Sequence, residues 1–259
     1  MSTRYRRISQ GLRHVPGFAL IAGLLIFCFI ARASSQTAGR DSKVQPLSES
    51  ETIQRIDAAV AFRTAHISGY SVKELYSIYR NGGVDPAAQV TVRTVYTRGA
   101  GKDYTPIAAT GSSMLRNIVI EKILANEKEM ARAENREKVA ITSSNYEMHL
   151  QPGKVVMNGR ECVVVTLKAR HKMSYLLNGK GWFDAADFTL VHLEGSPAQS
   201  VSVFAGETAG RRDYDRIDGF SMAKFAELHS HSFLFGDTVL KIDYSEYKID
   251  ADSTSPRNP

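Results

Sequence analysis

The fold class of this 259-residue chain is decided by one stretch, Gln89-Val-Thr-Val-Arg-Thr-Val-Tyr-Thr-Arg98. Its apolar and aromatic residues recur at every second position, which is the period of a β-strand with one buried face. Runs of the same period lie on both sides, at Tyr70–Arg80 and Lys102–Thr110, and turns at Asn81-Gly-Gly83 and Gly99-Ala-Gly101 separate the three. The sequence therefore predicts three successive antiparallel strands joined by short turns.

The chain returns to strand-like sequence after residue 140. We expect further strands at Tyr146–Gln151, Lys154–Met157, Cys162–Ala169, Lys172–Asn178, Gly181–Asp184, Phe188–Glu194 and about 200–204, 221–235 and 237–249. A turn at Gly179-Lys-Gly181 is expected to separate two of them. Because about ten strands in one twisted sheet curl rather than stay flat, we predict an α+β, mainly β fold. It is a single curved antiparallel sheet that forms an unclosed half β-barrel.

Two helical stretches are available to cover the concave face of this sheet. Ser48 and Glu51 have the spacing of a capping box, and apolar residues with helical spacing follow over about 49–65. A second helix opens at Gly111-Ser-Ser113 and has an apolar face that includes Met114, Ile118 and Leu124. Its continuation, Glu127–Lys138, is charged almost throughout and is either a solvated helix end or a lid.

Residues 1–33 have the layout of a secretory signal peptide. An arginine-rich start precedes fifteen uncharged residues, Gly17 to Ala31, and the small residues Ala31 and Ala33 mark the expected cleavage site. The alternative is an uncleaved anchor, because the eighteen uncharged residues between Arg13 and Arg32 would span about 27 Å as a helix. Both interpretations place residues 34–259 outside the cytoplasm.

The remaining chain divides by composition. We expect a flexible linker at 34–47, one half-barrel domain at 48–249 and a disordered tail at 250–259. The formal net charge of +6 does not indicate a nucleic-acid partner, because five of the 33 basic residues lie in 1–33, which contains no acidic residue. The nearly neutral remainder has no surface charge suited to a phosphate backbone.

Candidate catalytic and metal-binding patterns all have a simpler interpretation. The segment Arg98-Gly-Ala-Gly-Lys102 lacks the Ser or Thr of a phosphate loop and is interpreted as a hairpin turn. His229 and His231 have no further metal-ligand partners, and Asp184 and Asp187 fit a tight turn in which carboxylates accept backbone N–H groups. Cys162, alone beyond residue 33, is expected to be a buried thiol. We therefore predict no enzyme, no cofactor and no metal site.

Several segments resemble the LolA/LolB-like superfamily of bacterial periplasmic lipoprotein carriers and outer-membrane lipoprotein-sorting proteins. They are Asn158-Gly-Arg-Glu-Cys-Val-Val-Val-Thr-Leu167, Tyr175-Leu-Leu-Asn-Gly-Lys-Gly-Trp-Phe-Asp-Ala-Ala-Asp-Phe188, Leu193-Glu-Gly-Ser-Pro-Ala198, Ile217-Asp-Gly-Phe220 and Leu240-Lys-Ile-Asp-Tyr-Ser-Glu-Tyr247. The resemblance covers about residues 47–249. It implies an unclosed barrel whose concave face, capped by helices, holds acyl chains, and hence a periplasmic location. No cargo-contacting arginine of that superfamily aligns to a position here.

The alternating apolar residues are the candidates for a ligand cavity. We expect the lining to be drawn from Tyr146, Met148, Leu150, Val163, Val165, Leu167, Leu240, Ile242 and Tyr244 of the strands, facing Met114, Ile118 and Leu124 of the second helix. The same residues would equally form a packed core. The predicted function is an exported carrier of lipoprotein or lipid acyl chains. The alternative is a lipid-sensing regulatory protein with a membrane-protein partner in the cell envelope.

Overall fold

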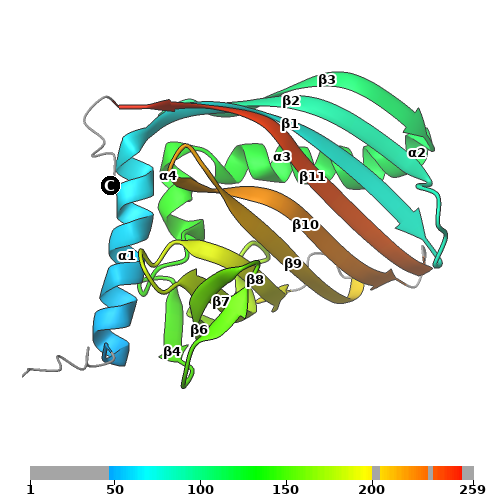
Figure 1. The fold of residues 1–259 in the computed structure, drawn as a ribbon. Helices are drawn as coiled ribbons and strands as arrows, with labels where there is room; N and C mark the ends of the chain where they lie inside the picture. Colours follow the sequence, from blue (N-terminus) through cyan, green and yellow to red (C-terminus); the bar gives the residue numbers. More distant parts are fainter. Residues whose placement is uncertain (1–46, 200–204, 233–235, 253–259) are drawn as a thin grey trace, which may run out of the picture. The chain divides into compact units, whose positions relative to one another are not determined.

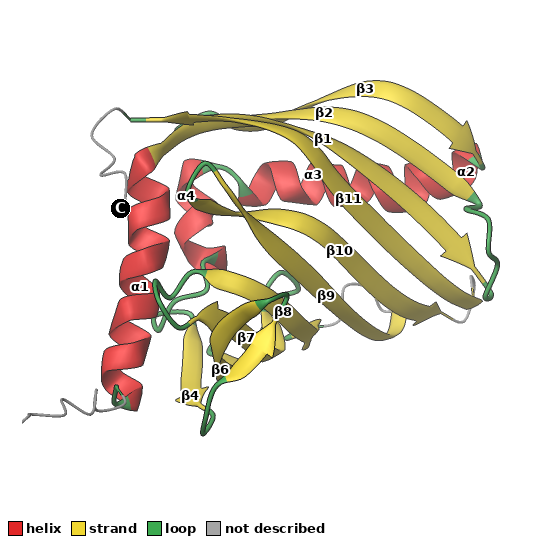
Figure 2. Cartoon of the chain, in the orientation of Figure 1, coloured by secondary structure: helices red, strands yellow, loops and turns green. Residues whose placement is uncertain are grey.

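The computed structural model describes residues 47–199, 205–232 and 236–252 (Figure 1). In these ranges one antiparallel sheet of eleven strands is accompanied by helices (Figure 2). This confirms the predicted fold class, an α+β, mainly β fold with a single unclosed sheet. The predicted signal peptide with Ala31 and Ala33, nearly all of the predicted linker and the predicted strand at 200–204 lie outside the described residues.

The first and last strands along the chain, β1 and β11, lie side by side. The strand order is β3-β2-β1-β11-β10-β9-β8-β7-β6-β4, with β5 paired to β6, and no pairing among the described residues joins β3 to β4. The sheet is therefore open between these two edge strands. The strands are β1 (Ile67–Arg80), β2 (Ala88–Thr97), β3 (Gly101–Gly111), β4 (Tyr146–Leu150), β5 (Val155–Met157), β6 (Arg160–Ala169), β7 (Leu177–Asp184), β8 (Leu190–Pro197), β9 (Ala205–Ile217), β10 (Phe220–Ser232) and β11 (Gly236–Ala251).

Helix α1 (Glu49–His66) begins as predicted. The Ser48 hydroxyl accepts the backbone N–H of Glu51 at 3.2 Å, and the Glu51 carboxylate accepts the backbone N–H of Ser48 at 3.0 Å. This capping box satisfies two N–H groups that have no partner within the helix. The other helical segments lie between β3 and β4: α2 (Ser113–Leu115), the π-helical η1 (Arg116–Ile120), α3 (Glu121–Met130), α4 (Ala133–Arg136) and the 3-10 turn η2 (Glu137–Val139).

The helices cover the concave face at two places and create two main cores. What we call the α3 core joins α2 and η1 to the long strands, and its buried members include Leu115, Ile120, Tyr76, Ile78, Val90, Val92, Leu240 and Ile242. The α1 core joins α1 to the shorter strands through Ile56, Tyr146, Met148, Val165, Leu167, Leu176, Phe183, Phe188 and Leu193. Each such side chain contributes roughly 1.5–3 kcal/mol of burial free energy, so these two cores provide most of the folding stability.

A row of glycines crosses the neighbouring strands β7, β8 and β9. In Figure 1, β6 to β8 turn away from the long strands. Gly179 of β7 pairs with Gly195 of β8, which pairs with Gly210 of β9. A Cβ atom on Gly179 would lie 2.0 Å from the carbonyl oxygen of Glu194, so only glycine permits this approach of two backbones. The predicted turn at Gly179-Lys-Gly181 is therefore wrong, because β7 runs through it without a break.

Other sequence predictions in this region also need correction. The predicted strand Lys172–Asn178 begins only at Leu177, because the Leu176 N–H donates to the Met173 carbonyl at 3.2 Å and the resulting turn places Leu176 in the α1 core. Phe188 does not start a strand: its φ of +60° belongs to the preceding turn, and β8 begins at Leu190. At the C-terminus, β11 continues to Ala251, beyond the predicted end at 249.

Strand β9 is not predicted by the sequence pattern. Its inward positions include Gly210, which belongs to the glycine row, and Arg212, which forms an ion pair beneath α3. Neither supplies the apolar alternation by which a half-buried strand is recognised.

Candidate functional site

The predicted cavity residues separate into the two cores. Tyr146, Met148, Leu150, Val163, Val165 and Leu167 belong to the α1 core or pack against it. Leu240 and Ile242 are buried in the α3 core, and Tyr244 and Leu124 pack against this core. The structure therefore places these residues on the concave face but in two groups, and their role as a cavity lining stays a prediction.

Met114 and Ile118 do not face the sheet, contrary to expectation. Their exposed fractions are 53% and 36%, whereas Leu115 and Ile120 are buried against the strands. The π-helical segment η1 widens the helix at this point and changes which residues share a face. A prediction based on a uniform period of 3.6 residues therefore selects the wrong side.

A charged cluster lies between α3 and the concave face of the sheet. Lys102 of β3 donates to Glu127 Oε2 of α3 at 2.7 Å, and the Tyr104 hydroxyl lies 3.3 Å from the same oxygen. The other carboxylate oxygen, Oε1, lies 3.8 Å from the guanidinium of Arg212 on β9. One carboxylate therefore bridges two cations from strands that are far apart in the sheet.

A second carboxylate lies on the same face. Glu74 of β1 is only 1% exposed, and its Oε2 accepts the hydroxyl of Tyr76 at 2.6 Å. In the pairing register Glu74 stands opposite Tyr244 of β11. The concave face thus carries carboxylates, cations and tyrosine hydroxyls next to the apolar side chains of the α3 core.

The two carboxylates have pKa values displaced in opposite directions. Burial raises the pKa of Glu74, and the charge of Lys102 only partly offsets this. Burial also opposes ionisation of Glu127, but the charges of Lys102 and Arg212 and the hydrogen bonds from Lys102 and Tyr104 outweigh it. The pKa of Glu127 therefore lies below its usual range, and Glu127 is ionised at neutral pH.

Helix α3 is attached to the sheet mainly by polar contacts. None of its residues is fully buried, and only Ile123 and Leu124 pack against the α3 core. Beside the pair of Lys102 and Glu127, Lys128 donates to Asp103 at 2.7 Å on the exposed side. The two adjacent pairs link α3 to β3, so Glu127 and Lys128, the first residues of the charged continuation, contact the sheet. Whether the whole continuation acts as a lid stays a prediction.

This cluster is not predicted from the sequence. In the sequence, Lys102 is recognised only as the end of a hairpin turn, and Arg212 lies in a strand that has no recognisable apolar alternation. The one available signal is that Glu74 and Tyr76 share a face of β1 with the apolar residues Val72 and Ile78, which places a carboxylate on an otherwise apolar, buried face.

The outer face has grooves of about 760 and 420 Å³. The larger groove contains His229 and His231, whose imidazoles lie 2.9 Å from Glu227 and 2.7 Å from Asp237. Each histidine thus has its own carboxylate partner. In the part of the chain that the structure describes, no group of three or more metal-ligating side chains occurs.

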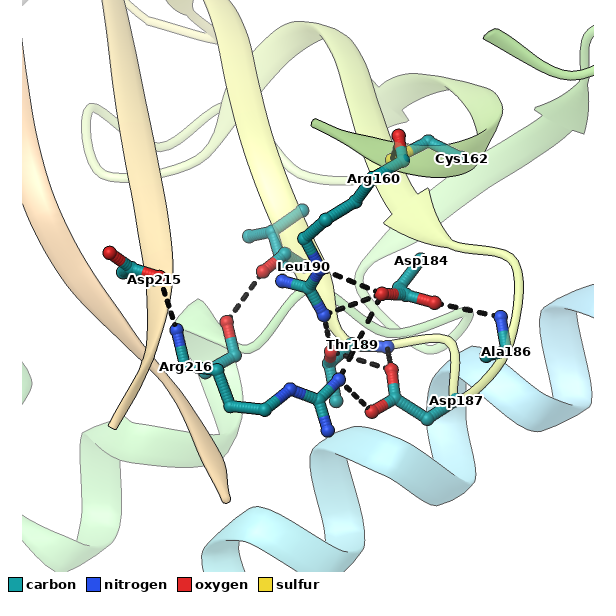
Figure 3. Close-up of polar contacts among 10 residues, drawn as sticks. Arg160, Cys162, Asp184, Ala186, Asp187, Thr189, Leu190, Asp215 and Arg216 are labelled. Carbon is teal, nitrogen blue, oxygen red and sulfur yellow. Dashed lines mark hydrogen bonds and ion pairs between the residues drawn. The ribbon is translucent and has the colours of Figure 1, made fainter. Parts of the chain in front are cut away.

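Asp184 and Asp187 stabilise the turn between β7 and β8 (Figure 3). Asp184 accepts the backbone N–H of Ala186 at 2.8 Å and forms an ion pair with Arg160 at 2.6 Å. Asp187 accepts the backbone N–H of Thr189 at 3.1 Å and forms an ion pair with Arg216. This confirms the turn interpretation of both carboxylates. Cys162 is a buried free thiol, also as predicted.

Comparison with known proteins gives distant likenesses only. No protein-family model and no curated protein matches the sequence. Similar solved structures include a DUF1329 family protein from Desulfovibrio piger (12% identity, TM-score 0.37, covering 77% of this chain and 93% of that one). Others are a LolA superfamily protein from Nitrosomonas europaea (12%, 0.38, 79% and 94%) and an outer membrane lipoprotein-sorting protein domain from Vibrio parahaemolyticus (10%, 0.43, 80% and 95%). Likeness at this level assigns no function.

Across the described residues, no helix combines the length and the apolar character needed to cross a membrane.

Proposed function

We propose that this chain is an exported, non-enzymatic carrier that binds an acyl chain of a lipoprotein or lipid between the concave face of the sheet and α3, and transports it across the periplasm. The observation that supports this proposal is the attachment of α3. The helix covers an apolar surface, yet it buries no residue of its own completely and is linked to the sheet through Glu127.

The energetics of such an exchange are favourable. Burial of an acyl chain stabilises the complex by about 0.8 kcal/mol per CH₂ group. The bound acyl chain would replace the contacts that Ile123 and Leu124 make with the α3 core in the empty protein. Because few apolar contacts of α3 are lost, a modest bias between open and closed states is enough for uptake and release.

Two features of the sequence agree with this role. The arrangement of residues 1–33 predicts export, and the segments of β6 to β8 resemble those of periplasmic lipoprotein carriers. Hydrolysis is not proposed, since Asp184 and Asp187 are occupied by the turn and its two arginines.

Movement of α3 provides the test. Asp103→Cys and Lys128→Cys, joined by a short bismaleimide, would hold α3 on β3. The full chain is expressed, purified from the cell envelope and incubated with oleate or a palmitoylated peptide, and bound mass is measured by native mass spectrometry. We expect bound acyl mass on the untreated double variant and none on the cross-linked protein.

The matched control is each single-cysteine variant treated with the same reagent, which should bind as the untreated protein does. Equal uptake by the cross-linked protein would show that α3 does not cover the site. If neither the untreated nor the cross-linked protein contains or takes up an acyl compound, the carrier function is refuted.

A further inference from the structure

Lys102 and Arg212 approach Glu127 from opposite sides of the concave face. Four strands separate β3 from β9 in the sheet order, yet both cations reach one carboxylate, Lys102 at Oε2 and Arg212 at Oε1. A carboxylate of another molecule, or a phosphate with two free oxygens, can likewise present two negatively charged oxygens to two cations. The two cations therefore form a receptor for an anion, and Glu127 fills it.

Displacement of α3 would leave this receptor without its anion. In the closed protein Lys102 and Glu127 are only 18% and 20% exposed, so their charges are partly shielded from water while they are paired. Glu74 on the same face also interacts with the charge of Lys102, but its carboxylate is buried and already accepts the Tyr76 hydroxyl. After displacement of α3, Lys102 and Arg212 would lack the carboxylate that pairs with them, and an incoming anion would supply a new partner.

The surroundings indicate what kind of molecule carries the anion. Tyr104 and Tyr244 lie beside the α3 core, whose apolar members Val92 and Ile242 are buried on the same face. Arg212 is 37% exposed, so one side of the receptor is open to solvent. An amphiphile could thus place its charged group on Lys102 and Arg212 and its tail along the apolar strands.

We propose that Lys102 and Arg212 bind the anionic group, a phosphate or a carboxylate, of the carried acyl lipid, and that Glu127 occupies the same site in the closed protein. This inference rests on the proposed carrier function. It narrows the cargo to acyl compounds with an anionic group close to the chain.

The test compares lipids that have the same unsaturated hydrocarbon tail and differ in charge. In the phosphate arm, the affinity for anionic 1-oleoyl lysophosphatidate is compared with the affinity for neutral 1-oleoylglycerol. In the carboxylate arm, the affinity for oleate is compared with the affinity for oleyl alcohol. We expect the full-length protein to bind at least one anionic member about tenfold more tightly than its neutral partner, the size of a charge-assisted hydrogen bond. Which arm shows the preference identifies the headgroup chemistry.

Variants assign that preference to the two cations. Lys102→Met and Arg212→Met should reduce the affinity for the anionic lipid to that for the neutral one, while Lys102→Arg should retain the difference. Lys73→Met is the matched control, because Lys73 pairs with Glu246 at 3.0 Å and is not part of the cluster. It should bind all four lipids as the unmodified protein does.

Three results would overturn the inference. Equal affinities for anionic and neutral lipids in the unmodified protein would leave the carrier function intact and remove the anion site. If Lys102→Met unfolds at the same temperature as the unmodified protein but no longer binds the neutral lipids, Lys102 has a structural role instead. If none of the four lipids binds, the carrier function itself is refuted.

Discussion

Lys102 Nζ of β3 lies 2.7 Å from Glu127 Oε2 of α3, and the two side chains are 18% and 20% exposed. Desolvation of two charges offsets most of the attraction in a pair of this kind, whereas loss of one partner leaves an uncompensated charge. The pair therefore defines where α3 lies on the sheet more than it adds to the stability of the fold. This relationship leads to the first two predictions.

Glu127→Gln should lower the free energy of unfolding by about 3 kcal/mol at pH 7, because Lys102 and Arg212 lose their shared counter-charge. Urea denaturation followed by circular dichroism measures this. Glu246→Gln is the control: Glu246 is 51% exposed and pairs with Lys73 and Arg93. Its substitution should cost less than about 1 kcal/mol, and equal costs for the two variants would contradict a special role for Glu127.

Acid should weaken the contribution of Glu127. Its pKa in the folded protein lies below the ordinary value of 4.5, so the associated stability is complete above pH 4.5 and is lost as the pH falls through the folded pKa. The difference in melting temperature between the unmodified protein and Glu127→Gln should therefore narrow from pH 7 to pH 3. A constant difference over this range would mean that the carboxylate charge is irrelevant.

Glu74 should behave in the opposite sense. Burial raises its folded pKa above 4.5, so its favourable contribution is present below pH 4.5 and is lost as the pH rises through the folded pKa. Glu74→Gln retains an acceptor for the Tyr76 hydroxyl and should raise the melting temperature at pH 7 but change it little at pH 4. Thermal unfolding at both pH values provides the measurement. Destabilisation of similar size at both would refute it.

Two of the predicted cavity residues, one buried and one exposed, should differ in their contribution to stability. Leu167 is 1% exposed in the α1 core, and Leu167→Ala should destabilise the protein by about 2–5 kcal/mol. Met114 is 53% exposed, and Met114→Ala should change stability by less than about 0.5 kcal/mol. Chemical denaturation of both variants tests the placement. A large effect at Met114 would restore it to the core.

The glycine row should tolerate no side chain at Gly179. A Cβ atom there would meet the Glu194 carbonyl oxygen at 2.0 Å, so Gly179→Ala requires β7 and β8 to separate and should cost more than about 3 kcal/mol. Gly153 has φ of +79°, and a methyl group at its Cα would have no residue beyond its chain neighbours within 4 Å. Gly153→Ala should therefore cost only about 1 kcal/mol, through backbone strain. Thermal melts that rank the two variants in the reverse order would contradict this account.

Local patterns predicted most of the elements. The start of α1 followed from Ser48 and Glu51, and β1 to β3 followed from the alternation around Gln89–Arg98. Predictions failed where a residue serves a distant partner: Gly179 admits the backbone of β8, and Arg212 faces Glu127 rather than an apolar neighbour. In each case the residue type is required by a contact with a residue that is distant in the chain, so a local sequence pattern does not reveal it.

The sequence by itself determined the class of fold and the apolar character of the concave face, because the period of a strand and the cap of a helix depend on residues close together in the chain. Only the tertiary structure decided that Lys102, Glu127 and Arg212 meet. Their meeting depends on the order in which strands pair and on the path of α3 across them. Those are set by the long-range packing of the sheet and its helices, which also determines the electrostatic environment of the site.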